Sequence, residues 1–187
     1  MKNIILSAIF FINSMVLFSQ STANPDTVCY GTSGSVYQLV NTPGLTYNWV
    51  VSSPGILQSG QGTNQINVDW SAALPGIITN GITVVATDAN GCTSNPVTLD
   101  VFIYQVIPTI TPVGPFCEGY PCVNLVTSPI GGQFAGNGTI GNQFCPISSG
   151  NGTHIITYTV NVNGCIFTTT TSIVVNPTPV LSPIQHN

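Results

Sequence analysis

Short runs of β-branched and aromatic residues, separated by Gly, Pro and Asn, follow one another along most of this chain. Beyond residue 24, no segment has apolar residues at the three- and four-residue spacing of an amphipathic helix. Apolar runs bounded by turn residues are typical of strands. In the first half we expect strands at 35–40, 46–52, 56–59, 65–70, 81–87 and 97–104. The pattern predicts an all-β protein.

The second half continues the same pattern. We expect strands at 123–126, 132–135, 139–140, 154–162 and 166–175. Asn163-Gly164 lies between the last two of these runs and is a strong signal for a two-residue hairpin turn. Several short strands with turns at such intervals indicate β-sandwich domains. In the first half, Tyr47, Trp49 and Val51 share one face of a strand and Asn48, Val50 and Ser52 the other, so we expect Trp49 in a core.

A cysteine pattern occurs twice and divides the chain. Cys29-x-Gly31 opens a β-rich segment that closes with Asn90-Gly91-Cys92, and Cys117-x-Gly119 opens another that closes with Asn163-Gly164-Cys165. An internal repeat of this kind indicates two tandem modules. We therefore expect two disulfide-containing β-sandwich domains, at 24–106 and 107–176. The segment 177–187 is rich in proline and is expected to be an extended tail outside the fold.

The N-terminus has the features of a secretory signal peptide, which we place at residues 1–23. Lys2 supplies a positive charge, residues 4–18 are mostly apolar, and Ser21-Thr22-Ala23 offers small residues for cleavage. The apolar run is short for a membrane-spanning helix, which needs about 20 residues. An uncleaved anchor is the alternative. No later segment resembles a transmembrane span, so we expect an exported protein at the cell surface, outside the cell or, alternatively, in the periplasm.

Charge excludes several kinds of partner. Lys2 is the only Lys or Arg of the chain, so the exported protein is expected to contain neither. Nucleic-acid binding depends on cationic side chains and is excluded. Docking on anionic lipid is excluded for the same reason.

Six cysteines in an exported chain are typical of disulfide bonds. By analogy between the two modules we pair Cys29 with Cys92 and Cys117 with Cys165, which leaves Cys122 for Cys145. A zinc site is the rival interpretation. It is disfavoured because His154 and His186 lie far from each other and from Cys117-x4-Cys122.

Patterns that suggest cofactor or metal chemistry have simpler interpretations. Gly136-x-Gly138-x-x-Gly141 fits a dinucleotide-binding string, but glycine and proline surround it and no helix can follow. Asp88-Ala89-Asn90-Gly91 resembles the start of a calcium loop but lacks the later oxygen ligands. We interpret both as turns and expect no cofactor or metal.

The chain has few side chains that could act as catalytic acids or bases. A glycosidase needs two carboxylates in one cleft, and Asp100, which alternates with Leu99 and Val101, is expected to face solvent. A serine hydrolase needs a His beside a Ser and an acid, and His154 begins a strand. We expect no catalytic residues and no enzyme.

The motifs together resemble a known group of modules. The first half contains Tyr47-x-Trp49-x-Val51, the glycine-rich segment 59–64 and Asn90-Gly91-Cys92. It resembles the PKD-like and immunoglobulin-like repeats of surface proteins from gliding bacteria of the Bacteroidota. The second half contains the glycine-rich segment 129–144 and then 150–158, and is similar to a companion immunoglobulin-like repeat of those proteins.

The resemblance implies a structural or adhesive protein, in which the partners are other envelope or surface proteins or further copies of the chain. It also implies a connection with gliding or type IX secretion. In the tail, we expect Val180, Leu181 and Ile184 to bind such a partner; a loose chain end is the alternative. A second hypothesis is a carbohydrate-binding module. It needs an exposed aromatic platform of Trp70 with Tyr104 or Tyr120, although Trp70 is also a candidate for packing.

Composition gives a first testable prediction. Because the chain after residue 23 contains neither Lys nor Arg, trypsin should leave the exported protein intact even when it is reduced and unfolded. Mass spectrometry after digestion in urea checks this outcome. A tryptic fragment from within residues 24–187 would contradict it, whereas release of an N-terminal peptide would not.

Overall fold

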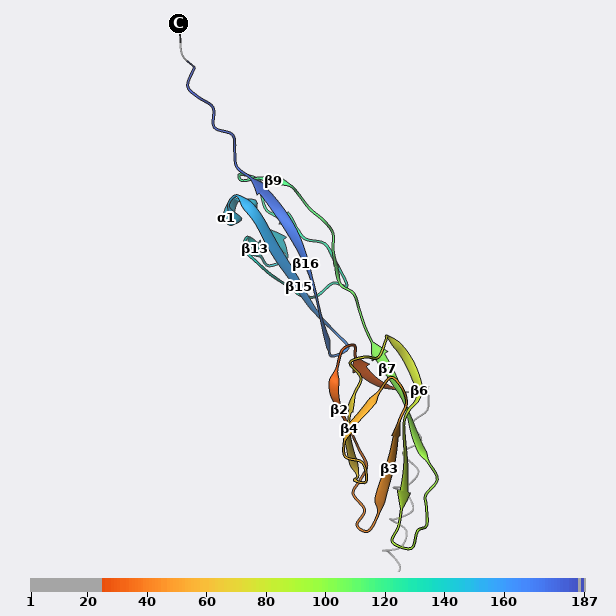
Figure 1. The fold of residues 1–187 in the computed structure, drawn as a ribbon. Coiled ribbons are helices and arrows are strands. Elements are labelled where there is room, and N and C mark those ends of the chain that lie inside the picture. Colours follow the sequence, from red (N-terminus) through yellow and green to blue (C-terminus); the bar gives the residue numbers. More distant parts are fainter. Residues whose placement is uncertain (1–24, 185, 187) are drawn as a thin grey trace, which may run out of the picture. The chain divides into compact units, whose positions relative to one another are not determined.

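The computed structural model of the chain describes residues 25–184 and 186 (Figure 1). The chain divides into two compact units, residues 1–105 and 106–187, and each is described by itself. The sequence places the change of domain at residue 107. The predicted signal peptide, residues 1–23, lies outside the described residues.

The first unit is a sandwich of two β-sheets. One sheet consists, in spatial order, of β1 (Asp26–Cys29), β7 (Val97–Tyr104), β6 (Gly76–Thr87) and β3 (Thr46–Val51). The other consists of β2 (Ser33–Gln38), β5 (Gln65–Asp69) and β4 (Ile56–Ser59). Alternating side chains of the two sheets meet in one apolar core, as expected for stacked sheets. The predicted all-β sandwich is therefore confirmed.

Two tryptophans lie in this core. Trp49 is buried on β3, as predicted, and its indole Nε1 donates a hydrogen bond to the Thr63 carbonyl at 2.8 Å. Trp70 directly follows β5 and is completely buried. Its Nε1 donates to the hydroxyl of Tyr37 on β2 at 3.1 Å. Both indole donors are satisfied, so both large side chains are buried without leaving an unpaired polar group.

The strand predicted at 81–87 begins earlier, at Gly76, and Asn80-Gly81 forms a bulge within it. The register between β6 and β7 shifts between Ile78 and Ile82, opposite Asp100. Asn80 has a positive φ of 49°, and its N–H donates to the Asp100 carboxylate at 2.6 Å. The prediction that Asp100 faces solvent is wrong: its side chain is only 3% exposed, because it caps the bulge.

The outer edge of β3 is closed by a side chain. Gln61 accepts the N–H of Trp49 with its Oε1 at 2.8 Å and donates its Nε2 to the Trp49 carbonyl at 3.0 Å. Next to this contact, Gly62 and Tyr47 exchange backbone hydrogen bonds of 3.0 and 3.3 Å. The side-chain amide thus replaces a neighbouring strand and prevents pairing with another chain at this edge.

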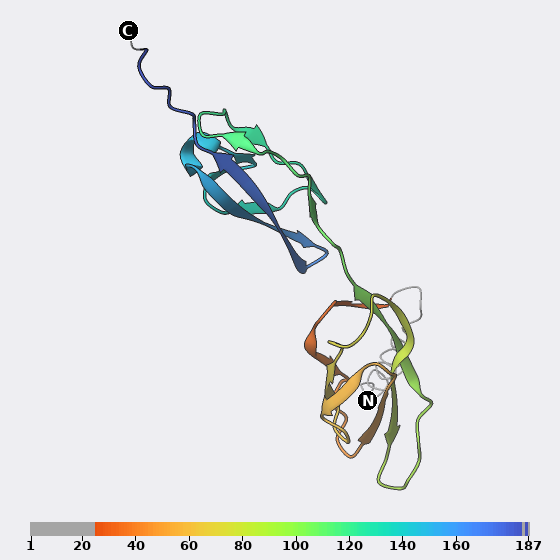
Figure 2. The same cartoon turned by 45° about the horizontal axis from the view of Figure 1, so that its top comes forward.

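The second unit is also built of β-strands (Figure 2). Its largest sheet consists of β12 (Gln133–Ala135), β15 (Gly152–Val162), β16 (Cys165–Asn176) and β9 (Phe116–Cys117). A smaller sheet consists of β10 (Val123–Asn124), β14 (Gln143–Phe144) and β13 (Thr139–Ile140). The remaining elements are the pair β8 (Thr109–Ile110) and β11 (Thr127–Ser128), and the one-turn helix α1 (Pro146–Ser149). No helix among the described residues has the length and apolar character to span a bilayer.

The β15–β16 hairpin contains the two longest strands of this unit, and the sequence predicts this hairpin. Its strands pair without interruption from Gly152–Val175 to Val162–Cys165. Asn163 and Gly164 both have positive φ values, 53° and 83°, which matches the two-residue turn expected for Asn-Gly. The inner face of the hairpin packs on the smaller sheet through a core that includes Phe144, Ile156 and Ile173. The string 136–141 forms turns around β13, so its interpretation as a turn is confirmed.

The bulge gives a prediction for stability. Replacing Asp100 by Ala removes the buried carboxylate that accepts the Asn80 N–H. Hydrogen bonds to charged groups contribute more than neutral ones, so the free energy of unfolding should fall by about 1–3 kcal/mol. Urea unfolding followed by tryptophan fluorescence measures this change. Thr79→Ala, on the exposed part of the same bulge, is the control and should stay within about 0.5 kcal/mol. An equal loss in both variants would show that the hydrogen bond has no special role.

Candidate functional site

One of the three predicted disulfides is present. Cys122 and Cys145 form a bond with a sequence separation of 23 residues. It ties the loop before β10 to the residue that follows β14. Cys145 is buried at this junction, and its backbone N–H donates to the Gly138 carbonyl at 2.7 Å. The bond therefore fastens the smaller sheet of the second unit.

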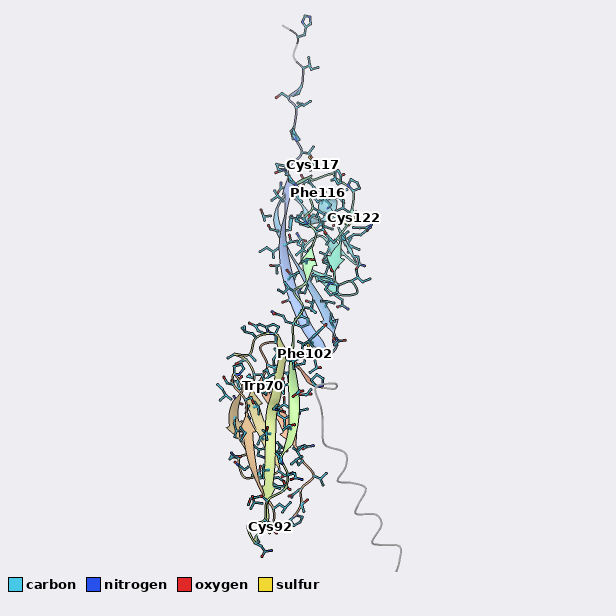
Figure 3. The ribbon with its side chains drawn as sticks, turned by 90° about the vertical axis from the view of Figure 1, so that its right-hand side faces the viewer. Trp70, Cys92, Phe102, Phe116, Cys117 and Cys122 are labelled. Atoms are coloured by element: carbon cyan, nitrogen blue, oxygen red, sulfur yellow. A yellow bond between two sulfur atoms is a disulfide. The ribbon has the colours of Figure 1, made fainter. Side chains whose placement is uncertain are left out.

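The other two predicted pairs are wrong, because Cys92 and Cys117 are free and exposed. Figure 3 shows Cys92 in the loop between β6 and β7. Cys29 pairs in register with Tyr104, at the opposite end of β7. The eight residues of β7 span roughly 25 Å at 3.3 Å per residue. A disulfide needs Cα atoms about 4.4–6.8 Å apart, so Cys29 and Cys92 cannot meet.

The same obstacle separates Cys117 from Cys165. Cys165 begins β16, and Cys117 pairs in register with Asn176 at the other end of that strand. The repeated sequence pattern thus marks opposite ends of a long strand in both units, not two sides of a bridge. Cys29 and Cys165 are themselves disulfide-bonded. Disulfide bonding fits an exported protein.

The aromatic platform proposed for carbohydrate binding is not formed. Trp70, its central residue, is completely buried and cannot stack on a sugar. Tyr104, at the end of β7, is partly buried, and its ring lies 6.0 Å from that of Phe102. Tyr120 belongs to the second unit and is 47% exposed, with its ring 5.1 Å from that of Phe116. The assignment of Trp70 as a glycan-stacking residue is therefore wrong.

The candidate calcium loop is a hydrogen-bonded turn. Oδ1 of Asp88 accepts the backbone N–H groups of Asn90 and Cys92 at 2.9 and 2.8 Å. The bond from Cys92 is the largest cause that lowers the pKa of the Asp88 carboxyl below its ordinary value. The charge of Asp88 is thus used to hold its own turn. Within residues 25–184 and 186, no group of three His, Cys, Asp or Glu residues lies close enough to hold a metal.

A cavity opens on one flank of the first unit, where the two sheets are not joined. It has a volume of about 210 Å³ and lies between β2 and the beginning of β7. Its lining is mostly apolar and includes Leu39, Trp49, Ile82, Val97 and Leu99. No local motif in the sequence predicts this cavity, because it depends on where β1 begins to cover β7.

The extent of β1 determines how far this flank is closed. β1 runs parallel to β7, and its first residue, Asp26, pairs with Val101. Among the described residues, no strand pairs with 97–100 on that side of β7. The residue before β1 is Pro25, which has no N–H to donate. Within residues 25–184, the first half of β7 is therefore an open sheet edge beside an apolar cavity.

The tail is the most exposed apolar segment of the described chain. After β16 ends at Asn176, residues 177–184 form no strand or helix and are all exposed. The three predicted partner-binding side chains, Val180, Leu181 and Ile184, are 95%, 89% and 102% exposed. They contact nothing that would bury them within the described residues. The tail and the open flank are therefore the two features of the chain that are suited to binding another chain.

The second unit also contains a cavity, of about 220 Å³, beneath the loop that leads into β12. Tyr158 lines it, and its hydroxyl accepts the N–H of Gly132 at 2.8 Å and donates to the Pro129 carbonyl at 2.7 Å. These bonds fix the loop, so Tyr158 has a structural role here.

Comparison with known families finds a similarity for the first unit. Residues 17–101 match the family model of the PKD-like domain, which covers most of this unit, and the match agrees with its two-sheet sandwich. The first unit is thus similar to a PKD-like domain. Comparison with curated proteins found no match.

Solved structures with tandem β-modules are similar only at a distance. The fibronectin(III)-like modules of Clostridium thermocellum CbhA align with a TM-score of 0.36 and 13% identity, covering 87% of this chain and 95% of that one. The titin domains z1z2, in complex with telethonin, align with a TM-score of 0.29 and 15% identity, covering 87% of this chain and 96% of that one. The titin Ig tandem domains A164-A165 align with a TM-score of 0.26 and 14% identity, covering 82% of this chain and 93% of that one. These similarities carry no argument about function.

The cysteines give a testable prediction. Because Cys92 and Cys117 are free and exposed, the native protein should react with Ellman's reagent at two thiols. Cys92→Ser and Cys117→Ser should each remove one of them, and peptide mapping without reduction should recover the Cys122–Cys145 bond. Native protein without a reactive thiol would contradict the observed pairing.

Proposed function

We propose that this chain is a non-enzymatic structural or adhesive protein, exported to the cell surface, that acts by binding other proteins. The observation that carries the proposal is the tail, in which Val180, Leu181 and Ile184 are almost fully exposed. Exposed apolar groups that gather on one segment mark a binding site for another chain. The PKD-like first unit supports a modular, non-catalytic role.

The properties of the tail suit docking. It carries no charged side chain, and its prolines at 177, 179 and 183 restrict its conformations before binding. Ordering a proline-rich segment therefore costs less entropy than ordering a flexible one. Extended segments of this kind bind in grooves or add to a sheet edge.

The resemblance of both halves to repeats from gliding bacteria suggests the setting. We propose that the partner belongs to an envelope assembly connected with gliding or type IX secretion. Carbohydrate binding is not proposed, because it depended on Trp70, which is buried.

Deletion of the tail tests this function in cells. A chain that ends at Asn176 should still fold, because both cores lie before that residue, but it should no longer be retained on the envelope. The folded protein is then expected in the medium or the periplasm, as measured by fractionation and immunoblotting. Those two compartments also distinguish surface from periplasmic retention.

A matched control keeps the length and the prolines of the tail. Replacing Val180, Leu181 and Ile184 together by Ser removes only the apolar groups, and should release the protein as the deletion does. Unchanged co-fractionation of both variants with the envelope would overturn the proposal. Release by the deletion alone would assign retention to the backbone of the tail.

A further inference from the structure

We propose that the tail of one copy, residues 177–184, adds as a strand to the open edge of β7 in a second copy. This inference rests on the proposed function, because it names the partner that the tail binds. The partner is the flank of the first unit, where no strand of the described residues pairs with 97–100 beyond the end of β1 and a cavity of about 210 Å³ lies beside them.

The open edge presents backbone groups in a known direction. The Tyr30 N–H donates to the Tyr104 carbonyl at 2.9 Å, so Tyr104 directs its carbonyl towards the β1 side of β7. Backbone groups alternate between the two edges along a strand. Thr98, an even number of residues from Tyr104, therefore directs its N–H and C=O to the same side, before β1 begins. These groups can pair with an incoming strand.

The prolines of the tail are all at odd-numbered positions, so in an extended strand their nitrogen atoms lie along the same edge. Pro177, Pro179 and Pro183 are odd-numbered, whereas the even-numbered residues 178, 180, 182 and 184 all keep their N–H groups. When the tail is extended, one edge therefore has every donor and the other lacks most of them. Proline within a sheet is confined to edge strands, with the missing N–H on the solvent side. The tail has the sequence of a strand that joins a sheet by one edge only.

The side chains fit when the tail runs antiparallel to β7. The residues of β7 that contribute to the core alternate along the strand: Val97, Leu99, Val101 and Ile103. Thr98 is in the opposite phase, so its side chain lies on the other face of the sheet, although Thr98 also borders the cavity. In an antiparallel pair, directly opposite residues face the same side. The even-numbered tail residue bonded to Thr98 then also faces outwards. The odd-numbered residues face the cavity, and Leu181 is the large apolar side chain among them.

The contact continues an interface that already exists. β1 covers the second half of the same edge of β7, from Val101 to Tyr104. The tail would extend this coverage over the first half and meet Leu39 and Leu99, two partly buried side chains that line the cavity. These two side chains and the tail carry no charge. The Asp100 carboxylate at this edge is already bonded to the Asn80 N–H within its own unit. Because the two surfaces lie in different units, the contact is heterologous and links copies head to tail.

Purified protein tests the inference. Residues 24–187, with Cys92→Ser and Cys117→Ser so that thiols cannot link copies, should associate with increasing concentration in sedimentation velocity, beyond the dimer. The chain that ends at Asn176 should remain monomeric. Ser182→Pro removes an even-numbered N–H of the tail and should weaken association about tenfold or more. Ser182→Ala keeps that N–H and should associate like the parent.

Complementation identifies the groove. Thr98→Pro blocks the open edge but keeps the tail, and the chain ending at Asn176 keeps the edge but lacks the tail. Each should be monomeric alone, and their mixture should form one-to-one pairs and nothing larger. Thermal melting checks that Thr98→Pro is folded; Ser182→Pro lies outside the fold and does not depend on this check.

Several results would overturn the inference. They are a monomeric parent at all concentrations, association that survives Ser182→Pro, or a tail that protects residues 97–100 of its own chain from hydrogen exchange in a monomer. If purified copies do not associate while tail deletion still releases the protein from the envelope, the proposed function stands and only this partner is wrong.

Discussion

The first unit depends on the burial of one indole, that of Trp70. This side chain is the largest completely buried group and lies against the turn before β4, where Gly55 leaves room for it. A Cβ at Gly55 would lie 2.3 Å from the Trp70 ring, so no other residue fits without displacing it. On its polar side, Trp70 donates to Tyr37. Burial, and then the nearby charge of Asp26, raise the pKa of the Tyr37 phenol above its ordinary value. Trp70 thus connects β2, β4 and β5, and Tyr37 extends the connection to Asp26 at the start of β1.

This arrangement also determines what the unit leaves open. Asp26 is the first residue of β1 and lies near Tyr37, so the core that forms around Trp70 involves the beginning of that strand. β1 then runs towards the end of β7 and away from its beginning. The opposite edge of the sheet, at β3, is closed by Gln61. Among the residues that the structure describes, the β7 flank of this unit consequently has both a cavity and unpaired backbone.

Sequence patterns predicted those parts of the fold that local chemistry decides. The Asn163-Gly164 hairpin follows from the positive φ values that these residues adopt easily. Trp49 was placed in the core by simple alternation. Asn80-Gly81 has the same local chemistry, but there a distant carboxylate, that of Asp100, accepts the Asn80 N–H and turns the expected strand start into a bulge. Only the tertiary structure reveals that contact.

The pairing of the cysteines and the burial of Trp70 could not be predicted from the sequence for a related reason. The repeat correctly indicated two modules, but equal spacing does not state which end of a strand a cysteine occupies, and Cys29 and Cys92 lie at opposite ends of β7. A tryptophan at the end of a strand can face either the core or solvent. Trp70 faces the core because Gly55, without a Cβ, leaves space for its ring. The exposed tail was predicted from composition alone, since prolines at this spacing leave few other conformations.

The phase of those prolines affects how the chain behaves at high concentration. An extended apolar segment normally invites further strands on both sides, and this is how fibrils begin. In the tail, three of the four odd-numbered positions from 177 to 183 lack an N–H. A sheet that accepts the tail as its edge strand therefore has a new outer edge that lacks most N–H donors, so a further strand cannot pair with it. The missing N–H groups therefore block further growth at that edge. This allows a neutral, apolar segment to stay exposed on a chain that has no Lys or Arg after Lys2 to keep copies apart.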